Sequence, residues 1–151
     1  MRFTTVAAAF SALFFAFSAA AADKGTPEEA KALLTKAVAH YQAVGREAAF
    51  KDFADKKGPY VDRDLYLWCM DKAHIITHHT MVPPLVGKSG ETAKDAEGKV
   101  FSPAVTDEAL EKGTATVDYK YSNPVTKQIE PKTALAQKVS DNEVCAVGYY
   151  K

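Results

Sequence analysis

The 151-residue sequence has no excess of either charge, since 19 Lys and Arg residues balance 19 Asp and Glu residues. Removing an N-terminal segment, residues 1–22, takes away only Arg2 among the charged residues, so 19 − 1 = 18 cations face 19 anions. A near-neutral chain has no strong electrostatic attraction for polyanions. We therefore expect no binding to nucleic acid or to an anionic membrane surface.

Catalytic motifs are also missing. The sequence contains no Gly-x-Ser-x-Gly, no paired-cysteine redox motif and no glycine-rich phosphate loop, and its carboxylates are scattered through turns and helix faces. We expect no enzyme activity, no catalytic residue and no cofactor.

Cysteine is scarce: only Cys69 and Cys145 are present, and neither belongs to a pair spaced for zinc or haem. Each lies in an apolar, strand-like run. The two residues form either one disulfide, in an oxidising compartment, or two buried thiols.

Three of the four histidines, His74, His78 and His79, are close in sequence and offer an alternative metal site. His78 and His79 are adjacent in a predicted strand, so their side chains point to opposite faces. His74 and His78 could face the same way. We predict no metal site, and metal or redox sensing through the histidines and cysteines stays an alternative.

The N-terminal segment predicts a secretory signal peptide. Arg2 supplies the positive charge, residues 6–17 are almost wholly apolar, and small residues lead to Ala22. A membrane-spanning helix needs about 20 apolar residues, and this run is shorter. We expect cleavage near Ala22, a periplasmic or secreted protein, and no insertion of the mature chain into a membrane.

The mature chain, residues 23–151, has the length of a single domain. Thr26, Pro27 and Glu29 form a helix start, and apolar residues at helical spacing continue to Val44 before Gly45 stops the helix. A shorter helix follows over 47–53.

From residue 65 the hydrophobic period changes to two, which indicates strands. A long loop and a short helix, which opens at Ser102 and closes at Gly113, separate the second strand from the third. Helices followed by strands predict an α+β domain, with a long helix across one face of an antiparallel sheet. The five strands are expected over residues 65–70, 75–80, 114–121, 129–139 and 144–150.

Several spaced blocks of residues carry a family resemblance. They are Gly45-Arg46-Glu47 with Phe50 and Phe53, Gly58 with Tyr60-Val61-Asp62 and Asp64-Leu65-Tyr66, His79 with residues 85–88, and residues 119–132 with Gly148-Tyr149-Tyr150. Together they resemble the single Cache domains of bacterial extracytoplasmic sensors. The resemblance implies a PAS-like fold with a long N-terminal helix, strand order 2-1-5-4-3, and a pocket between the sheet and its connecting loops for small carboxylates, amines or amino acids.

The sequence departs from the family pattern at two places. Ala73-His74 replaces a glycine-containing turn after the first strand. After Pro131-Lys132, where Ser and Tyr are usual, Thr133-Ala134-Leu135 follow. The second departure predicts that an aromatic wall or hydroxyl of the usual pocket is missing.

The resemblance also suggests site residues. Tyr66, Trp68 and Met70 share one face of the first strand, and we expect Tyr66 and Trp68 to line a ligand pocket, unless both faces are simply core. The other expected ligand residues are His79 at the pocket mouth, Tyr119, Tyr121, Lys132 as a point charge for a carboxylate, and Arg46. Because strands one and five are neighbours in this family, the resemblance favours a Cys69–Cys145 disulfide.

We therefore predict an extracytoplasmic sensory domain that binds a small carboxylate or other polar metabolite. No transmembrane or output segment is expected after Lys151, so the predicted partners are a membrane-bound signalling protein or a second copy in a homodimer. The rival hypothesis is a structural scaffold with a filled core and no ligand.

Overall fold

The computed structural model describes residues 24–151, so the predicted signal peptide over 1–22 lies outside the described residues. The first described element, α1 (Pro27–Val44), opens with a complete capping box. Thr26 accepts a hydrogen bond from the Glu29 amide at 3.1 Å, and the Glu29 carboxylate accepts one from the Thr26 amide at 2.8 Å. Gly45, with φ of 82°, ends this helix and α2 (Arg46–Phe53) follows at once.

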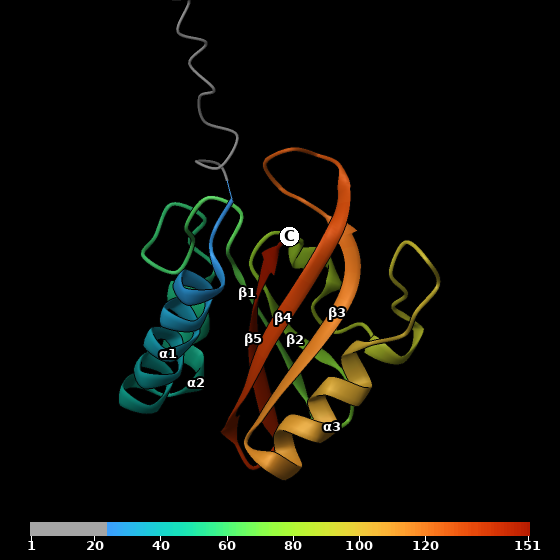
Figure 1. The fold of residues 1–151 in the computed structure, drawn as a ribbon. Helices are drawn as coiled ribbons and strands as arrows, with labels where there is room; N and C mark the ends of the chain where they lie inside the picture. Colours follow the sequence, from blue (N-terminus) through green and yellow to red (C-terminus); the bar gives the residue numbers. More distant parts are fainter. Residues whose placement is uncertain (1–23) are drawn as a thin grey trace, which may run out of the picture.

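Five strands form one antiparallel sheet in the order β2-β1-β5-β4-β3, as the resemblance implied (Figure 1). The strands are β1 (Leu67–Asp71), β2 (Ile76–His79), β3 (Thr114–Ser122), β4 (Ile129–Ser140) and β5 (Glu143–Tyr150). The first strand in sequence is therefore an interior strand, between β2 and the last strand, β5, which is central.

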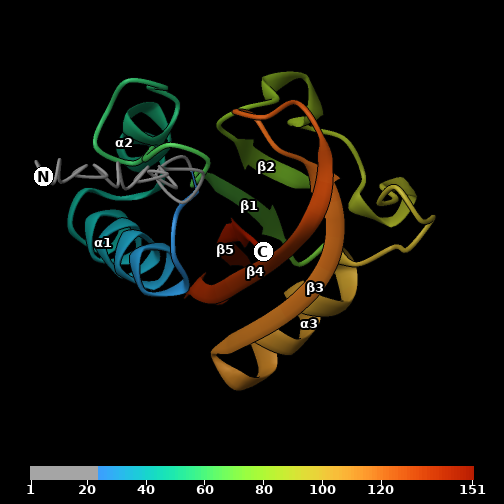
Figure 2. The same cartoon turned by 45° about the horizontal axis from the view of Figure 1, so that its top comes forward.

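Helices cover both faces of this sheet. In Figure 2, α1 and α2 lie on one side, and α3 (Ser102–Lys112) lies on the other with the long segment that joins β2 to it. That segment includes two short 3₁₀ helices, η1 (Pro83–Leu85) and η2 (Gly90–Thr92).

The alternation of side chains along β1 decides which face meets which layer. Leu67 and Cys69 belong to the core cluster under α1 and α2. Trp68 and Met70 belong to a second cluster with residues of α3 and β3. The face of Trp68 is thus the one that the long segment covers, a point that the sequence left open.

The two cysteines face each other across the central strand pair. Cys69 and Cys145 are register partners in β1 and β5, and their sulfur atoms are bonded. Of the two alternatives, the structure contains the disulfide, within the cluster beneath α1.

The turn between β1 and β2 has a left-handed residue that is not glycine. His74 has φ of 58°, a region that β-carbon crowding makes uncommon for residues other than glycine, although asparagine, aspartate and histidine adopt it more often than most. Its imidazole bridges two other elements, with Nδ1 3.1 Å from Glu91 of η2 and Nε2 2.8 Å from Asp107 of α3. These two contacts hold the turn where the family usually has glycine.

Within residues 24–151, no helix combines the length and apolar character that crossing a bilayer requires.

Candidate functional site

A cavity of about 200 Å³ lies between the sheet and the segment that connects β2 to α3. Its walls are mostly aromatic and aliphatic. Five of the seven predicted ligand residues line it, namely Tyr66, Trp68, His79, Tyr119 and Tyr121. The other lining residues are Met70, Ile76, Leu85, Ala93, Lys94, Phe101 and Ser102.

Stacked rings form one wall of this inner cavity. The Phe101 ring lies 3.9 Å from that of Tyr119, nearly parallel to it, and meets Trp68 edge-on at 6.4 Å. Sequence reasoning missed Phe101, which directly precedes the Ser102-Pro103 helix start. An apolar residue at that point commonly packs back onto the core.

His79 supplies a neutral polar group to the same cavity. Burial, with a further contribution from Lys132, lowers the pKa of its imidazole to about 3. Its Nδ1 accepts a hydrogen bond from the Val82 amide at 3.1 Å. The proton of the neutral ring therefore lies on Nε2, which makes that atom a donor.

Lys132 lies against the aromatic wall but does not line the cavity. Its side chain crosses β5 over Gly148, where an added β-carbon would come within 2.2 Å of the lysine Cε. Its Nζ lies 3.9 Å from the centre of the Tyr66 ring and 3.2 Å from the Tyr150 hydroxyl. The residue is fully buried, and desolvation lowers its pKa to about 7.

The second departure from the family pattern, Thr133-Ala134-Leu135, directly follows Lys132 in β4. Ala134 follows Lys132 on the same face of β4 and is fully buried in the cluster beneath α3. Thr133 points to the other face and donates to Asp118. A methyl group thus stands on the cavity side of β4 where the family usually carries a larger polar residue.

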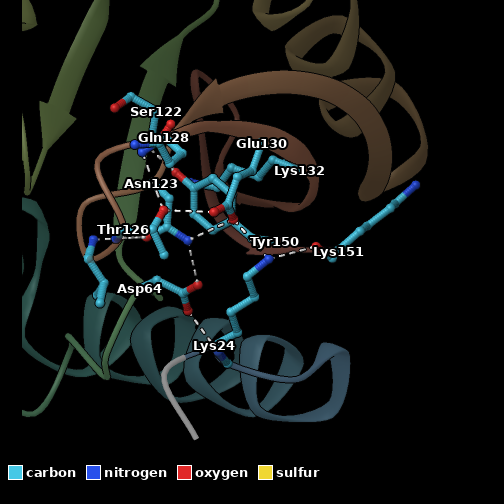
Figure 3. Close-up of polar contacts among 12 residues, drawn as sticks. Lys24, Asp64, Ser122, Asn123, Thr126, Gln128, Glu130, Lys132, Tyr150 and Lys151 are labelled. Atoms are coloured by element: carbon cyan, nitrogen blue, oxygen red, sulfur yellow. Dashed lines mark hydrogen bonds and ion pairs between the residues drawn. The ribbon is translucent and has the colours of Figure 1, made fainter. Parts of the chain in front are cut away.

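Hydrogen bonds continue from Lys132 into the β3–β4 hairpin (Figure 3). The Tyr150 hydroxyl accepts from Lys132 and donates to the Ser122 carbonyl at 2.7 Å. The next residue, Asn123, is fully buried and donates through Nδ2 to Asp64 at 3.0 Å and to Glu130 at 3.2 Å.

The same network reaches both ends of the described chain (Figure 3). Asp64, itself fully buried, accepts from the Gly25 amide at 2.7 Å. Lys24 pairs with Glu130 at 2.9 Å and donates to the Lys151 carbonyl at 2.8 Å. Lys132 behind the aromatic wall, the hairpin, the segment before α1 and the end of β5 are therefore connected by polar contacts.

An outer cavity of about 730 Å³ adjoins the inner one, and Tyr66, Lys94 and Tyr121 line both. One acidic residue, Asp95, lines it, and the Asp95 carboxylate already accepts three backbone amides of its own loop and β3. The cationic lining residues come from five separate segments, which is why sequence reasoning missed the cluster: Lys56, Arg63, Lys94, Lys120 and Lys127.

Arg46 is the predicted ligand residue that the structure places elsewhere. It lies at the start of α2, on the opposite side of the sheet, and forms a two-point ion pair with Glu143 at 2.9 and 3.0 Å. The Tyr41 hydroxyl donates to the same carboxylate at 2.7 Å. Arg46 thus anchors the two helices to β5.

The three clustered histidines do not converge. His74 binds Glu91 and Asp107, while His78 Nε2 contacts Thr80 Oγ1 at 3.0 Å in a buried site. Burial lowers the pKa of His78 to about 4. In the part of the chain that the structure describes, no group of three His, Cys, Asp or Glu side chains is arranged to hold a metal ion.

Known structures share this architecture. A methyl-accepting chemotaxis protein from Vibrio parahaemolyticus RIMD 2210633 has a TM-score of 0.68 and 21% sequence identity, over 82% of this chain and 86% of that one. A periplasmic sensor domain of a chemotaxis protein has a TM-score of 0.60 and 20% identity, over 82% and 88%. At such identities the likeness shows the fold alone.

A third similar structure is described as the structural basis for carboxylic acid recognition by a Cache chemosensory domain. Its TM-score is 0.61 at 24% identity, over 82% of this chain and 86% of that one. No curated protein matches the sequence. The sequence does match the family described as Single Cache domain 2 over residues 10–148, and the chain therefore belongs to this family of sensor domains.

Proposed function

We propose that this Cache domain binds a small carboxylate or other polar metabolite outside the cytoplasm and passes its occupancy to a separate membrane-bound signalling partner or to a second copy of the chain. The observation that carries the proposal is the pair of adjoining cavities, one with aromatic walls and the other lined by five cations and one carboxylate. Cations around an opening raise the local concentration of anions.

Two further observations support this function. The Cys69–Cys145 disulfide is typical of oxidising, extracytoplasmic compartments. One of the similar structures is described as a domain that recognises carboxylic acids. The rival hypothesis, a scaffold without a ligand, predicts a filled core, and the inner cavity of about 200 Å³ argues against it.

The proposal is one of binding without catalysis. Ser102 and His79 both line the inner cavity, yet among residues 24–151 no hydrogen bond joins them. The Ser102 hydroxyl instead donates to the Gly90 carbonyl. A serine nucleophile would need a base within hydrogen-bond reach.

Thermal-shift screening against organic acids, amino acids and amines tests the proposal. A ligand at one hundred times its dissociation constant stabilises the native state by about 2.7 kcal/mol, which raises the melting temperature of a domain of this size by roughly 5 °C or more. We expect acids to produce such shifts.

The variant Ala93→Leu, which places extra carbon atoms in the inner cavity, should remove the shift. Ala32→Leu, on the exposed side of α1, is the matched control and should leave the shift intact. No shift from any compound of the three classes would contradict the proposed function.

A further inference from the structure

The inner cavity offers almost no charge to a ligand. Of its twelve lining residues, only His79 and Lys94 carry basic groups, and burial keeps His79 neutral at physiological pH. The remaining polar groups are the Trp68 indole N–H and the hydroxyls of Ser102 and three tyrosines, and burial raises the tyrosine pKa values further above neutrality. The interior therefore suits an apolar body with few hydrogen-bonding groups.

Four of the five cations around the outer cavity already have partners. Arg63 pairs with Glu29 and Asp62, and Lys120 pairs with Glu97. Lys56 and Lys127 donate to backbone carbonyls of Met81 and Pro124.

Lys94 differs from the other four cations. Within residues 24–151, no hydrogen bond or ion pair engages its ammonium group, and it is the cation that lines both cavities. Its backbone is nevertheless held in place. Lys94 forms a β-bridge with Val100, and the neighbouring Asp95 accepts the amides of Lys99 and Lys120. The junction of the cavities therefore has a cation on a fixed stretch of backbone, and among the described residues its charge has no partner.

Lys132, by contrast, is a poor anion site in this arrangement. Its Nζ is enclosed by the Tyr66 and Tyr150 rings, at 3.9 and 4.4 Å from their centres, and donates to the Tyr150 hydroxyl. A ligand carboxylate in the cavity would have to displace the Tyr66 ring to reach it.

From these contacts we propose that the ligand is a monocarboxylate with an apolar body, bound with the body against the Trp68 and Phe101 rings in the inner cavity and the carboxylate at the junction on Lys94. This inference rests on the proposed function and adds the orientation of the ligand and its specificity-determining residue. The inner volume equals that of about seven water molecules in the liquid, which suits a body of roughly seven to ten non-hydrogen atoms. The phenylmethyl body of phenylacetate, with about seven carbon atoms, has this size.

Calorimetric titration with matched probes tests the orientation. Phenylacetate supplies the apolar acid, phenylacetamide is the same body without charge, and succinate is an acid without an apolar body. The wild-type protein should prefer phenylacetate over phenylacetamide by about tenfold to one hundredfold, the range of a charge-assisted hydrogen bond. It should also prefer phenylacetate over succinate.

Two lysine variants separate the possible anion sites. Lys94→Met should lower the affinity for phenylacetate by about tenfold to one hundredfold and leave that for phenylacetamide nearly unchanged. Lys127→Met is the matched control, because Lys127 lines only the outer cavity and already donates to Pro124, and it should change the phenylacetate affinity by less than about threefold.

The outcomes distinguish the orientation from the function itself. If Lys94→Met binds phenylacetate as the wild type does, while a folded Lys132→Met does not bind it, the carboxylate points inward and the orientation is wrong. Tighter binding of succinate would refute the apolar body. Either result leaves the domain a carboxylate sensor, whereas no binding of any acid in a broad screen overturns the proposed function as well.

Discussion

The buried lysine allows a quantitative prediction about stability and pH. In the folded protein the pKa of Lys132 is about 7, against 10.5 for an unburied lysine. Between these two values the unfolded chain binds a proton that the folded chain does not, so the free energy of unfolding rises with pH. The full difference of 3.5 units corresponds to roughly 5 kcal/mol, most of it from desolvation of the ammonium group.

Replacing Lys132 by Met removes this proton and keeps an unbranched side chain over Gly148. From pH 7 to pH 9 we expect the free energy of unfolding of the wild type to rise by about 2 kcal/mol relative to that of Lys132→Met. Below pH 6 the difference in free energy of unfolding between the two proteins should level off, because Lys132 is then protonated in both the folded and the unfolded wild type. Burial lowers the pKa values of His78 and His79 to about 4 and about 3 in the folded wild type, so neither imidazole gains a proton there above pH 6.

Urea unfolding at pH 6, 7, 8 and 9 measures this difference, with the disulfide kept intact. Trp68, the single tryptophan, is buried and reports the loss of structure by fluorescence. Lys120→Met is the control, since Lys120 is paired with Glu97 near the surface and its pKa is raised, so its difference from the wild type should be flat over this range. Parallel pH profiles for the wild type and Lys132→Met would refute the burial of a lysine with a depressed pKa.

Three further changes should have measurable effects. His74→Asn keeps a residue that tolerates left-handed φ but removes the imidazole, whose pKa is raised by Asp107 and Glu91. The wild type should therefore be more stable than the variant below pH 6.5, and this advantage should be lost as pH rises through the folded pKa of His74. A constant difference in urea midpoint between pH 5.5 and 8.5 would contradict the two ion pairs. Gly148→Ala should lower the free energy of unfolding by about 1–3 kcal/mol, because the new methyl group meets the aliphatic stem of Lys132. In a double-mutant cycle, adding Lys132→Ala should restore part of that loss, and additive effects of the two substitutions would exclude the contact. Reduction of the Cys69–Cys145 disulfide, which spans 76 residues, should lower the free energy of unfolding by about 4 kcal/mol. The Cys69→Ala/Cys145→Ala variant is the control and should not respond to reductant. If the stability of the wild type is unchanged by reductant, the bond contributes nothing.

The helices and strands were predictable because their signals are local, whereas the strand order followed from the family resemblance. The capping box at Thr26 and Gly45 placed α1 within a residue of its observed bounds. Alternation along residues 65–70 separated the face of Trp68 from that of Cys69 correctly, although only the structure showed which face α1 covers. A pattern of side chains along one strand contains no information on what lies across from it.

The charges of the site were harder to predict, because their roles depend on partners far away in sequence. A lysine on a strand is usually solvated, and Lys132 is buried only because Gly148, on the neighbouring strand, leaves room for its stem. Arg46 was expected to bind a ligand carboxylate, but its guanidinium group pairs with the carboxylate of Glu143, which is 97 residues later in the sequence. Lys94 lies in a long loop without periodicity, so nothing in the sequence distinguishes it from the other exposed lysines.

The buried polar network limits how the parts around the cavity can move. Asp64 and Asn123 are both fully buried, and each depends on the other and on a backbone amide or carboxylate for its hydrogen bonds. Because an unsatisfied buried polar group costs about 1–3 kcal/mol, separating the hairpin from the residue that precedes α1 would break several such contacts together. Lys24 forms an ion pair with Glu130 and donates a hydrogen bond to the Lys151 carbonyl, so both ends of the described chain contact the hairpin network. A displacement of the hairpin relative to Gly25 or Lys151 would therefore leave buried polar groups without partners, so these parts of the domain are expected to move as one unit.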